Sequence, residues 1–313
     1  MGADPTTCRG PAGSVQLHDE VLDSFDIFRG RPRTVEVLEG GLTNRNYKIT
    51  TPDGCYVARV SPEDTSALAI DRDAEYHNSV RAAAAGVGAP VISYAPEHHT
   101  LVVGFLKGRT FTNESFAVDG NLDRVAEAVR ALHAAEPFDN EFNMFRIQQN
   151  YLSIVQRHGY RLPDGYLDFA PHITRIADAT ASDPTSLVPC NNDLLAGNVI
   201  DDGSRLWLID YEYSGNNDPC FELGNIWSEC GLSADQLEQL VTCYYGKALP
   251  SKIARAELQG IVAKYGWTLW ASIQQATSPL DFDFWSWGTE RYEAAVSLLS
   301  SPRFEQLLTR LRA

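Results

Sequence analysis

The sequence lacks the long apolar segments that would direct a chain to a membrane and the basic clusters that would direct it to nucleic acid. No apolar run among its 313 residues is long enough to span a bilayer, and the N-terminus carries no apolar stretch typical of a signal peptide. No cluster of Lys and Arg is present, and the formal net charge is −15. The basic face that a nucleic-acid-binding protein needs is therefore missing.

Cysteine is also missing from any arrangement that forms a disulfide framework or binds zinc. The chain has six cysteines but no C-x-x-C pair, which predicts reduced thiols in a cytoplasmic protein. They are Cys8, Cys55, Cys190, Cys220, Cys230 and Cys243. Charged residues make up only 21% and hydrophobic residues 44%, so long disordered stretches are excluded and a sizeable core is expected.

The first third of the chain predicts a small α+β lobe. Residues 1–14 are rich in Gly, Pro and Thr and are expected to form a flexible tail. Residues 15–106 are expected to form an N-terminal lobe of five strands with one inserted helix at 70–85, preceded by a helical apolar stripe at 16–28. The expected strands are 34–38, 46–50, 55–60, 91–94 and 101–106.

Residues 107–313 are expected to form a larger, mostly helical lobe. Apolar residues recur at helical spacing in residues 122–135, and similar patterns follow. Two short strands are expected among these helices, at 198–202 and 205–210. A small antiparallel sheet followed by a helical lobe predicts an α+β fold of two lobes.

The strand-rich segment carries residues suited to phosphoryl transfer. That reaction needs a carboxylate to orient or deprotonate the attacking hydroxyl, and oxygen ligands to hold magnesium against nucleotide phosphates. Asp193 and Asn198 stand five residues apart, as do the Asp and Asn of the protein-kinase catalytic loop. Asp210 ends an apolar strand, like the metal-binding Asp of those kinases. Any one of them could simply cap a turn or a helix, but the ordered set predicts a kinase site.

These segments resemble the choline/ethanolamine kinase family, within the aminoglycoside-phosphotransferase-like superfamily, which implies a two-lobed protein-kinase-like fold. Residues 191–198 resemble the family's H-N-D-L-x-x-x-N segment, and residues 209–215 resemble I-D-Y-E-Y-x-G. Residues 221–225 followed by Glu229 resemble F-D-[IL]-[GA]-N-x-x-x-E. The resemblance extends over residues 37–292.

The resemblance implies a role for each of these polar residues. Asp193 would be the catalytic base. Asn198 and Asp210 would hold Mg²⁺, and Glu212 would assist a second metal ion.

Two residues depart from the family pattern. Asn192 is taken to stand where the family usually has a His that supports the loop, which leaves the level of activity open. Glu222 replaces a usual Asp at a position expected to be structural. Neither departure affects the inferred base or metal ligands.

The N-terminal lobe carries features that fit ATP. A glycine pair ending at Gly41, followed by Thr43 and Asn44, lies between two expected strands, where backbone amides can approach phosphate oxygens. Such glycines are also common in plain hairpins. Residues 102–105 resemble the hinge that binds adenine through its backbone, which implicates Val103 and Phe105.

A charged pair completes the expected nucleotide site. Arg59 lies on the third strand, where protein kinases carry Lys and the resembling family often has Arg. Either side chain can bind the α- and β-phosphates. Glu75, on the following helix, would pair with Arg59 and hold it in place.

Aromatic residues predict the pocket for the phosphate acceptor. Trp267 and Trp270 lie three residues apart in a helical segment and share a face. With Trp287 and Tyr213, they match aromatic positions of the family's choline pocket. Each ring face attracts a quaternary ammonium by about 0.5–2 kcal/mol, and Glu229 would add a negative charge. The alternative is that the tryptophans are core packing.

The sequence therefore predicts an ATP- and Mg²⁺-dependent kinase of a small cationic amino alcohol, choline or ethanolamine. The aromatic pocket favours a compact cation over the alternatives, a kinase of an aminoglycoside or of thiamine. A pseudokinase that only binds a ligand is disfavoured, because all the expected catalytic residues are present. The oligomeric state stays open.

Overall fold

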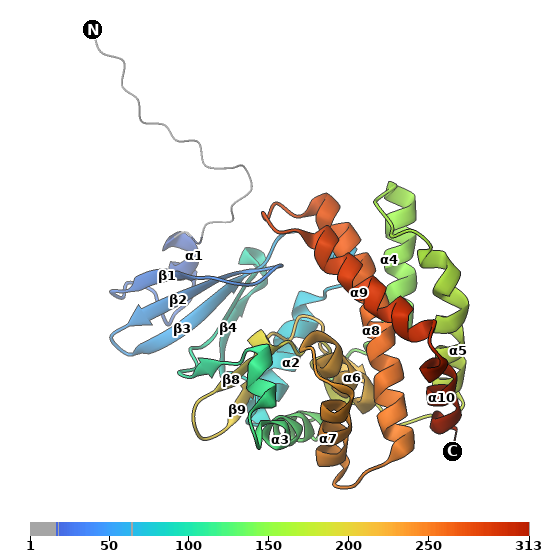
Figure 1. Cartoon of the computed structure of the whole chain (residues 1–313). Coiled ribbons are helices and arrows are strands. Elements are labelled where there is room, and N and C mark those ends of the chain that lie inside the picture. The colour runs from blue at the N-terminus through green and yellow to red at the C-terminus, as the bar shows by residue number, and fades with distance from the viewer. Residues whose placement is uncertain (1–16, 18, 64, 313) are drawn as a thin grey trace.

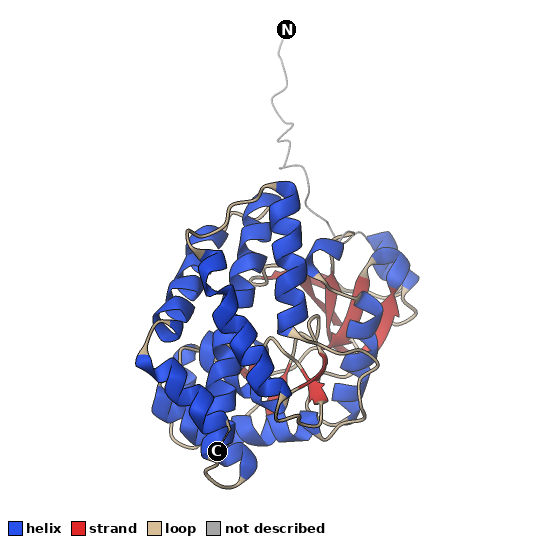
Figure 2. Cartoon of the chain, turned by 90° about the vertical axis from the view of Figure 1, so that its right-hand side faces the viewer, coloured by secondary structure: helices blue, strands red, loops and turns tan. Residues whose placement is uncertain are grey.

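The computed structural model describes residue 17 and residues 19–63 and 65–312, and Figure 1 shows the whole chain. The predicted tail at residues 1–14 lies outside the described residues. The remainder folds into an antiparallel sheet with few helices on one side and a larger helical part on the other (Figures 1 and 2). The two-lobed α+β prediction is confirmed.

The first lobe is built on a five-stranded antiparallel sheet in the order β1-β2-β3-β5-β4. Its strands are β1 (Thr34–Leu38), β2 (Arg45–Thr51), β3 (Gly54–Val60), β4 (Val91–Ala95) and β5 (Thr100–Gly104). All five predicted strands are present, with ends shifted by at most two residues. Helix α2 (Arg72–Ala84) follows β3, and the Asp71 carboxylate caps it by accepting from the N–H groups of Asp73 and Ala74.

The predicted helix at residues 16–28 is wrong in its extent. Within the described residues, α1 covers only Asp19–Ser24, and turns follow it. The apolar stripe is nevertheless buried, because Leu22, Phe25 and Phe28 pack against the sheet. Burial of the stripe therefore does not require a continuous helix.

The second lobe holds two small sheets and most of the helices. Strands β6 (Arg109–Thr110), β8 (Val199–Asp201) and β9 (Leu206–Leu208) form one sheet, and β7 (Val188–Cys190) pairs with β10 (Gly215–Asn217). The large sheet ends at Gly104, so the predicted boundary between residues 106 and 107 falls between the lobes' sheets. The helices are α3 (Asn121–His133), α4 (Met144–His158), α5 (Ala170–Ala181), α6 (Pro219–Glu229), α7 (Ala234–Tyr245), α8 (Pro250–Thr277), α9 (Phe284–Leu299) and α10 (Pro302–Leu311). Short 3₁₀ turns occur at Ser66–Leu68, Pro96–His98, Asn113–Ala117, Tyr166–Phe169 and Ala196–Asn198.

Helix α8 is the central element of the second lobe. Its 28 residues are buried on every side over most of its length, and α4, α6, α9 and α10 pack around it (Figure 1). Even so, no helix in the described part of the chain is long and apolar enough to cross a membrane.

Glycines allow α6 and α8 to approach closely. A Cβ atom added at Gly224 would lie 2.1 Å from the Ala256 carbonyl oxygen, and one at Gly260 would lie 2.6 Å from the Gly224 carbonyl oxygen. Both obstacles are backbone atoms, which cannot move without separating the helices. This contact fixes α6, and α6 in turn carries Glu222 and Glu229.

We expect Gly224→Ala to destabilise the protein by about 1–3 kcal/mol or more, since overpacking forces backbone shifts. The midpoint of urea unfolding should fall accordingly. Gly197→Ala is the matched control, because a Cβ there meets nothing within 4 Å and its backbone is not left-handed. An unchanged midpoint for Gly224→Ala would show that the two helices can separate at little cost.

Candidate active site

A cavity of about 620 Å³ is lined by residues of both lobes. Its walls come from the loop after β1, from β3 and β5, from the segments around β8 and β9, and from α6, α8 and α9. All the site residues predicted from the sequence line this one cavity. They are Gly41, Thr43, Asn44, Arg59, Glu75, Val103, Phe105, Asp193, Asn198, Asp210, Glu212, Tyr213, Glu229, Trp267, Trp270 and Trp287.

The loop between β7 and β8 is held by hydrogen bonds to its own backbone. The Asn198 side-chain amide donates to the Asp193 carbonyl oxygen (2.9 Å), and the Asp193 N–H donates to Asn191 Oδ1 (3.1 Å). Asn191 also reaches the next loop, since its Nδ2 donates to the carbonyl oxygens of Ile209 (3.1 Å) and Asp210 (2.8 Å). The loops that carry Asp193 and Asp210 are therefore tied together.

The assignment of the histidine departure to Asn192 is wrong. Matched residue by residue, the H-N-D-L-x-x-x-N segment places its His at Asn191. Asn191 bridges the two loops, so an amide supports the loop there in place of an imidazole. Asn192 is fully buried in a left-handed conformation (φ 67°), and its Nδ2 donates to the carbonyl oxygens of Tyr213 and Gly215.

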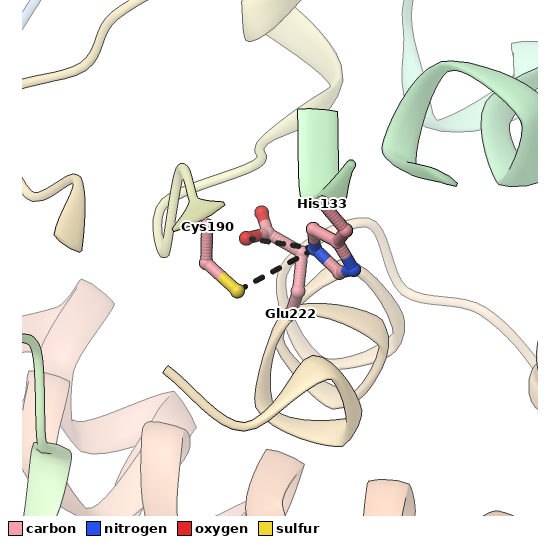
Figure 3. A group of neighbouring side chains, drawn as sticks. All are labelled: His133, Cys190 and Glu222. Carbon is pink, nitrogen blue, oxygen red and sulfur yellow. Dashed lines mark hydrogen bonds and ion pairs between the residues drawn. The ribbon is translucent and has the colours of Figure 1, made fainter. Parts of the chain in front are cut away.

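A buried cluster of His133, Cys190 and Glu222 lies beneath the loop (Figure 3). His133 Nε2 lies 3.4 Å from Cys190 Sγ and 3.8 Å from Glu222 Oε2. Both oxygens of Glu222 accept the Asn192 N–H (3.1 and 3.3 Å). Three potential metal ligands meet here, but burial and the Glu222 charge raise the pKa of the Cys190 thiol far above its usual range. The hydrogen bonds among His133, Cys190, Glu222 and the Asn192 N–H fit a support for the loop.

Asp210 lies two residues after β9 and has a left-handed backbone (φ 66°). This conformation ends the strand and turns the carboxylate toward β3, where Arg59 Nη2 donates to Asp210 Oδ1 (2.5 Å). The predicted pairing of Arg59 with Glu75 is present, with Nε 3.1 Å from Oε1. Arg59 thus links α2 to the Asp210 loop across the lobes.

Glu212 is held by the N-terminal lobe. Its Oε2 accepts from Asn44 Nδ2 (2.7 Å) and from Arg72 Nη1 (3.1 Å), and it lies 3.1 Å from Arg59 Nη2. Arg72 also pairs with Glu75 (2.6 Å). Two arginines and three carboxylates therefore form one partly buried network.

The protein environment shifts the pKa values of the three central carboxylates in different directions. Burial, reinforced by Asp210 and Glu212, raises the pKa of Asp193 well above its usual value. Burial also raises the pKa of Asp210 to about 6, although the Arg59 charge opposes it. For Glu212, burial is outweighed by Arg59, Arg72 and the Asn44 hydrogen bond, so its pKa is lowered. The pKa values of Asp193 and Asp210 are thus raised, whereas that of Glu212 is lowered.

Asn198 and Asp210 suit a hard metal ion. Because the Asn198 amide nitrogen is engaged with Asp193, the amide oxygen is left as a ligand. The Asp210 carboxylate supplies a second oxygen donor from the neighbouring loop. Oxygen-only donors of this kind are those that Mg²⁺ prefers.

The residues predicted to bind the nucleotide include a glycine loop and a hinge whose N–H groups already have partners. Gly40 and Gly41 both have positive φ (93° and 99°), a conformation that favours glycine. At the hinge, the Phe105 N–H donates to the Cys55 carbonyl oxygen (3.0 Å) and the Gly104 N–H to Pro90 (2.8 Å). An adenine contact at Phe105 would therefore use its carbonyl group.

Part of the cavity wall is aromatic. Trp270 Nε1 donates to the Tyr213 hydroxyl (2.9 Å), and the Tyr213 ring packs edge-on to Trp267 at 5.0 Å. The Trp287 ring lies 5.4 Å from that of Trp270. Trp267 and Trp270 are also largely buried, so they serve both as core and as cavity wall.

Glu229, the expected counter-charge, already has a partner. Arg291 Nη2 donates to its Oε2 (2.5 Å), and the guanidinium lies over the ring of Trp287.

Comparison with known proteins places this site in a family. Residues 35–248 match the family described as Choline/ethanolamine kinase. The chain belongs to the choline/ethanolamine kinase family. It is therefore a phosphotransferase that uses an alcohol group as acceptor, and more narrowly an amino-alcohol kinase.

Individual relatives agree with this membership. A solved structure of a choline/ethanolamine kinase family protein from Mesorhizobium loti is 30% identical, with a TM-score of 0.82, and covers 94% of this chain and 98% of its own. Choline kinase LicA from Streptococcus pneumoniae is 25% identical, with a TM-score of 0.74 and coverage of 85% and 93%. Ethanolamine kinase 1 of Mus musculus is 24% identical over 84% of this chain and 83% of its own.

More distant kinases share the fold. The ternary complex of streptomycin, ATP and APH(2")-IIa superposes with a TM-score of 0.60 at 17% identity, over 83% of this chain and 91% of that one. The protein therefore shares its fold with aminoglycoside phosphotransferases, as the sequence predicted.

Sequence reasoning missed three residues of this family member's site. Arg72 stands three residues before Glu75 on the same helix, and that spacing could have revealed it. Asn191 was visible as part of the family segment. Arg291 lies 62 residues from its partner Glu229, and no local pattern signals the pair.

Proposed function

We propose that this protein transfers the γ-phosphoryl group of ATP to the hydroxyl of choline or ethanolamine, with Mg²⁺ as the metal. The observation that carries the proposal is the continuity of the site. One cavity is lined both by Asp193, Asn198 and Asp210 and by aromatic side chains. A hydroxyl on a short, compact cation could lie at Asp193 while its head group contacts the rings.

Asp193 would act as the base for the acceptor hydroxyl. Its raised pKa makes it better able to hold the proton released by the attacking oxygen. Its backbone hydrogen bonds to Asn191 and Asn198 fix the loop, so the carboxylate is positioned before the acceptor binds.

Mg²⁺ would be held by Asn198 and Asp210 and would neutralise charge on the transferring phosphates. Arg59 supplies positive charge beside this position, and Glu75 orients it. The loop with Gly41, together with Thr43, would bring backbone amides to the phosphates. Glu212, which is engaged with Arg59 and Arg72, would assist a second metal ion.

Several broader features accompany this proposal. We propose that the lobes divide near residue 106, that ATP lies between them, and that the partner is a small amine rather than a nucleic acid. The cysteines of the described residues are free thiols, which supports a cytoplasmic location for the protein.

We expect Trp270→Ala to raise the KM for choline by a few-fold to about thirtyfold, which corresponds to one ring-face contact of about 0.5–2 kcal/mol. The KM for ATP should change much less, because Trp270 belongs to the aromatic part of the cavity wall. Trp207→Ala is the matched control, since Trp207 lies on β9 and does not line the cavity. Equal effects on both KM values, together with a lowered melting temperature, would return Trp270 to a packing role.

The test of the function is a substrate panel with ATP and Mg²⁺, read out by ADP release. The panel contains choline, ethanolamine, thiamine and an aminoglycoside. Release with choline or ethanolamine supports the proposal. Release only with thiamine or the aminoglycoside would replace the acceptor, and no release with any compound would leave a ligand-binding module.

A further inference from the structure

The negative charge of Glu229 is already matched inside the protein. Glu229 ends α6, and its side chain is only 1% exposed. Its Oε2 accepts from both Nε (3.1 Å) and Nη2 (2.5 Å) of Arg291, and its Oε1 accepts from Ser228 Oγ (3.0 Å). Both carboxylate oxygens are therefore engaged by donors of the chain.

Arg291 also backs the aromatic wall. It projects from α9, and its guanidinium carbon lies 3.3 Å from the ring centroid of Trp287. Its Nη1 donates to the Trp287 carbonyl oxygen (3.3 Å). Glu229 and Trp287 line the cavity whereas Arg291 does not, so the guanidinium lies behind them.

A second cation lies near the same carboxylate. Lys264 of α8 donates to the Ser228 carbonyl oxygen (2.9 Å). Burial lowers the pKa of Lys264, an effect that the Glu229 charge opposes and the Arg291 charge adds to. One carboxylate thus interacts with two basic side chains, which leaves it little net attraction for a further cation.

We propose that Arg291 is a specificity-determining residue, which neutralises Glu229 so that the acceptor's head group is bound by ring faces and not by a carboxylate. This inference rests on the proposed amino-alcohol kinase function. A primary ammonium carries N–H donors that lose free energy when buried without acceptors. A quaternary ammonium has no such donors and needs only ring faces, shape and charge. The site therefore favours a quaternary over a primary ammonium.

The first test compares kcat/KM for ethanolamine and choline. Arg291→Met keeps a long apolar side chain but removes the charge and the donors, which frees the Glu229 carboxylate. The ratio of ethanolamine to choline should rise about tenfold, the effect of one charge-assisted hydrogen bond. The double variant Arg291→Met/Glu229→Gln should return toward the wild-type ratio, because the freed acceptor charge is gone.

Arg175→Met is the matched control. Arg175 also forms a two-point pair with a glutamate, Glu305 (both contacts 2.7 Å), but that pair is exposed on α5 and α10. Its ratio should equal that of the wild type. An unchanged ratio in folded Arg291→Met, or a wild type that uses ethanolamine at least as well as choline, would overturn the proposal.

A binding test on the wild-type protein needs no variant and no turnover. Tetramethylammonium and methylammonium are titrated while tryptophan fluorescence is followed. Tighter binding of tetramethylammonium supports the proposal, even if the substrate panel shows no ADP release and the kinase function fails. Equal or tighter binding of methylammonium, or no binding of either ion, overturns the inference while leaving the kinase assay to judge the function.

Discussion

Replacing Asp193 by Asn should reduce turnover by about 10²–10⁴-fold while nucleotide affinity stays nearly constant. The substitution keeps the size of the side chain and removes only its ability to accept the hydroxyl proton. The loop should survive, because its bonds at this position use the backbone N–H and carbonyl of residue 193. The measurements are initial rates of ADP release and equilibrium binding of ADP.

The matched control is Asp178→Asn, which removes an exposed carboxylate on α5, away from the cavity. Its rate should equal that of the wild type. If Asp193→Asn keeps more than half of the wild-type turnover, Asp193 has no part in proton transfer, and the base must be sought elsewhere.

Local patterns explain why the sequence predicted so much of this fold. The strand around Ile49 alternates in burial, so a period of two residues identifies it without knowledge of its partners. The apolar stripe through Leu22 and Phe28 was equally visible, but periodicity reports burial rather than backbone conformation. That is why the stripe was predicted as one helix while the structure has a short helix followed by turns.

The central residues of the candidate site were also accessible from the sequence, because they lie close together in the chain. Asp193 and Asn198 share one loop, and Asp210 follows the next strand, so a single hairpin brings them together. The site residues in distant segments of the chain were predicted from the family resemblance. Their gathering around one cavity is a product of tertiary structure that spacing alone does not specify.

Pairs between distant helices could not be predicted in this way. The pairing of Arg291 with Glu229 depends on how α9 packs beside α6, which no periodicity encodes. The sequence therefore presented Glu229 as a free counter-charge, and only the packing reveals that the chain itself supplies the cation. The same limit applies to the bridge from Asn191 to the Asp210 loop.

Replacing Asp210 by Ala should abolish productive binding of the magnesium–nucleotide complex and with it nearly all transfer. The carboxylate is the only full negative charge among the two inferred ligands, and Mg²⁺ depends on such hard oxygen donors. The change has a second consequence, because Arg59 loses its 2.5 Å partner and is left to Glu75 and Glu212.

A companion variant separates these effects from backbone strain. Residue 210 has a φ of 66°, which Ala tolerates poorly and Asn tolerates well. Asp210→Asn should therefore retain the melting temperature of the wild type and still lose magnesium-dependent nucleotide binding, measured by titrating ATP with and without Mg²⁺. If Asp210→Asn binds the nucleotide with unchanged magnesium dependence and turns over normally, Asp210 is a structural partner of Arg59 and the metal ligand lies elsewhere.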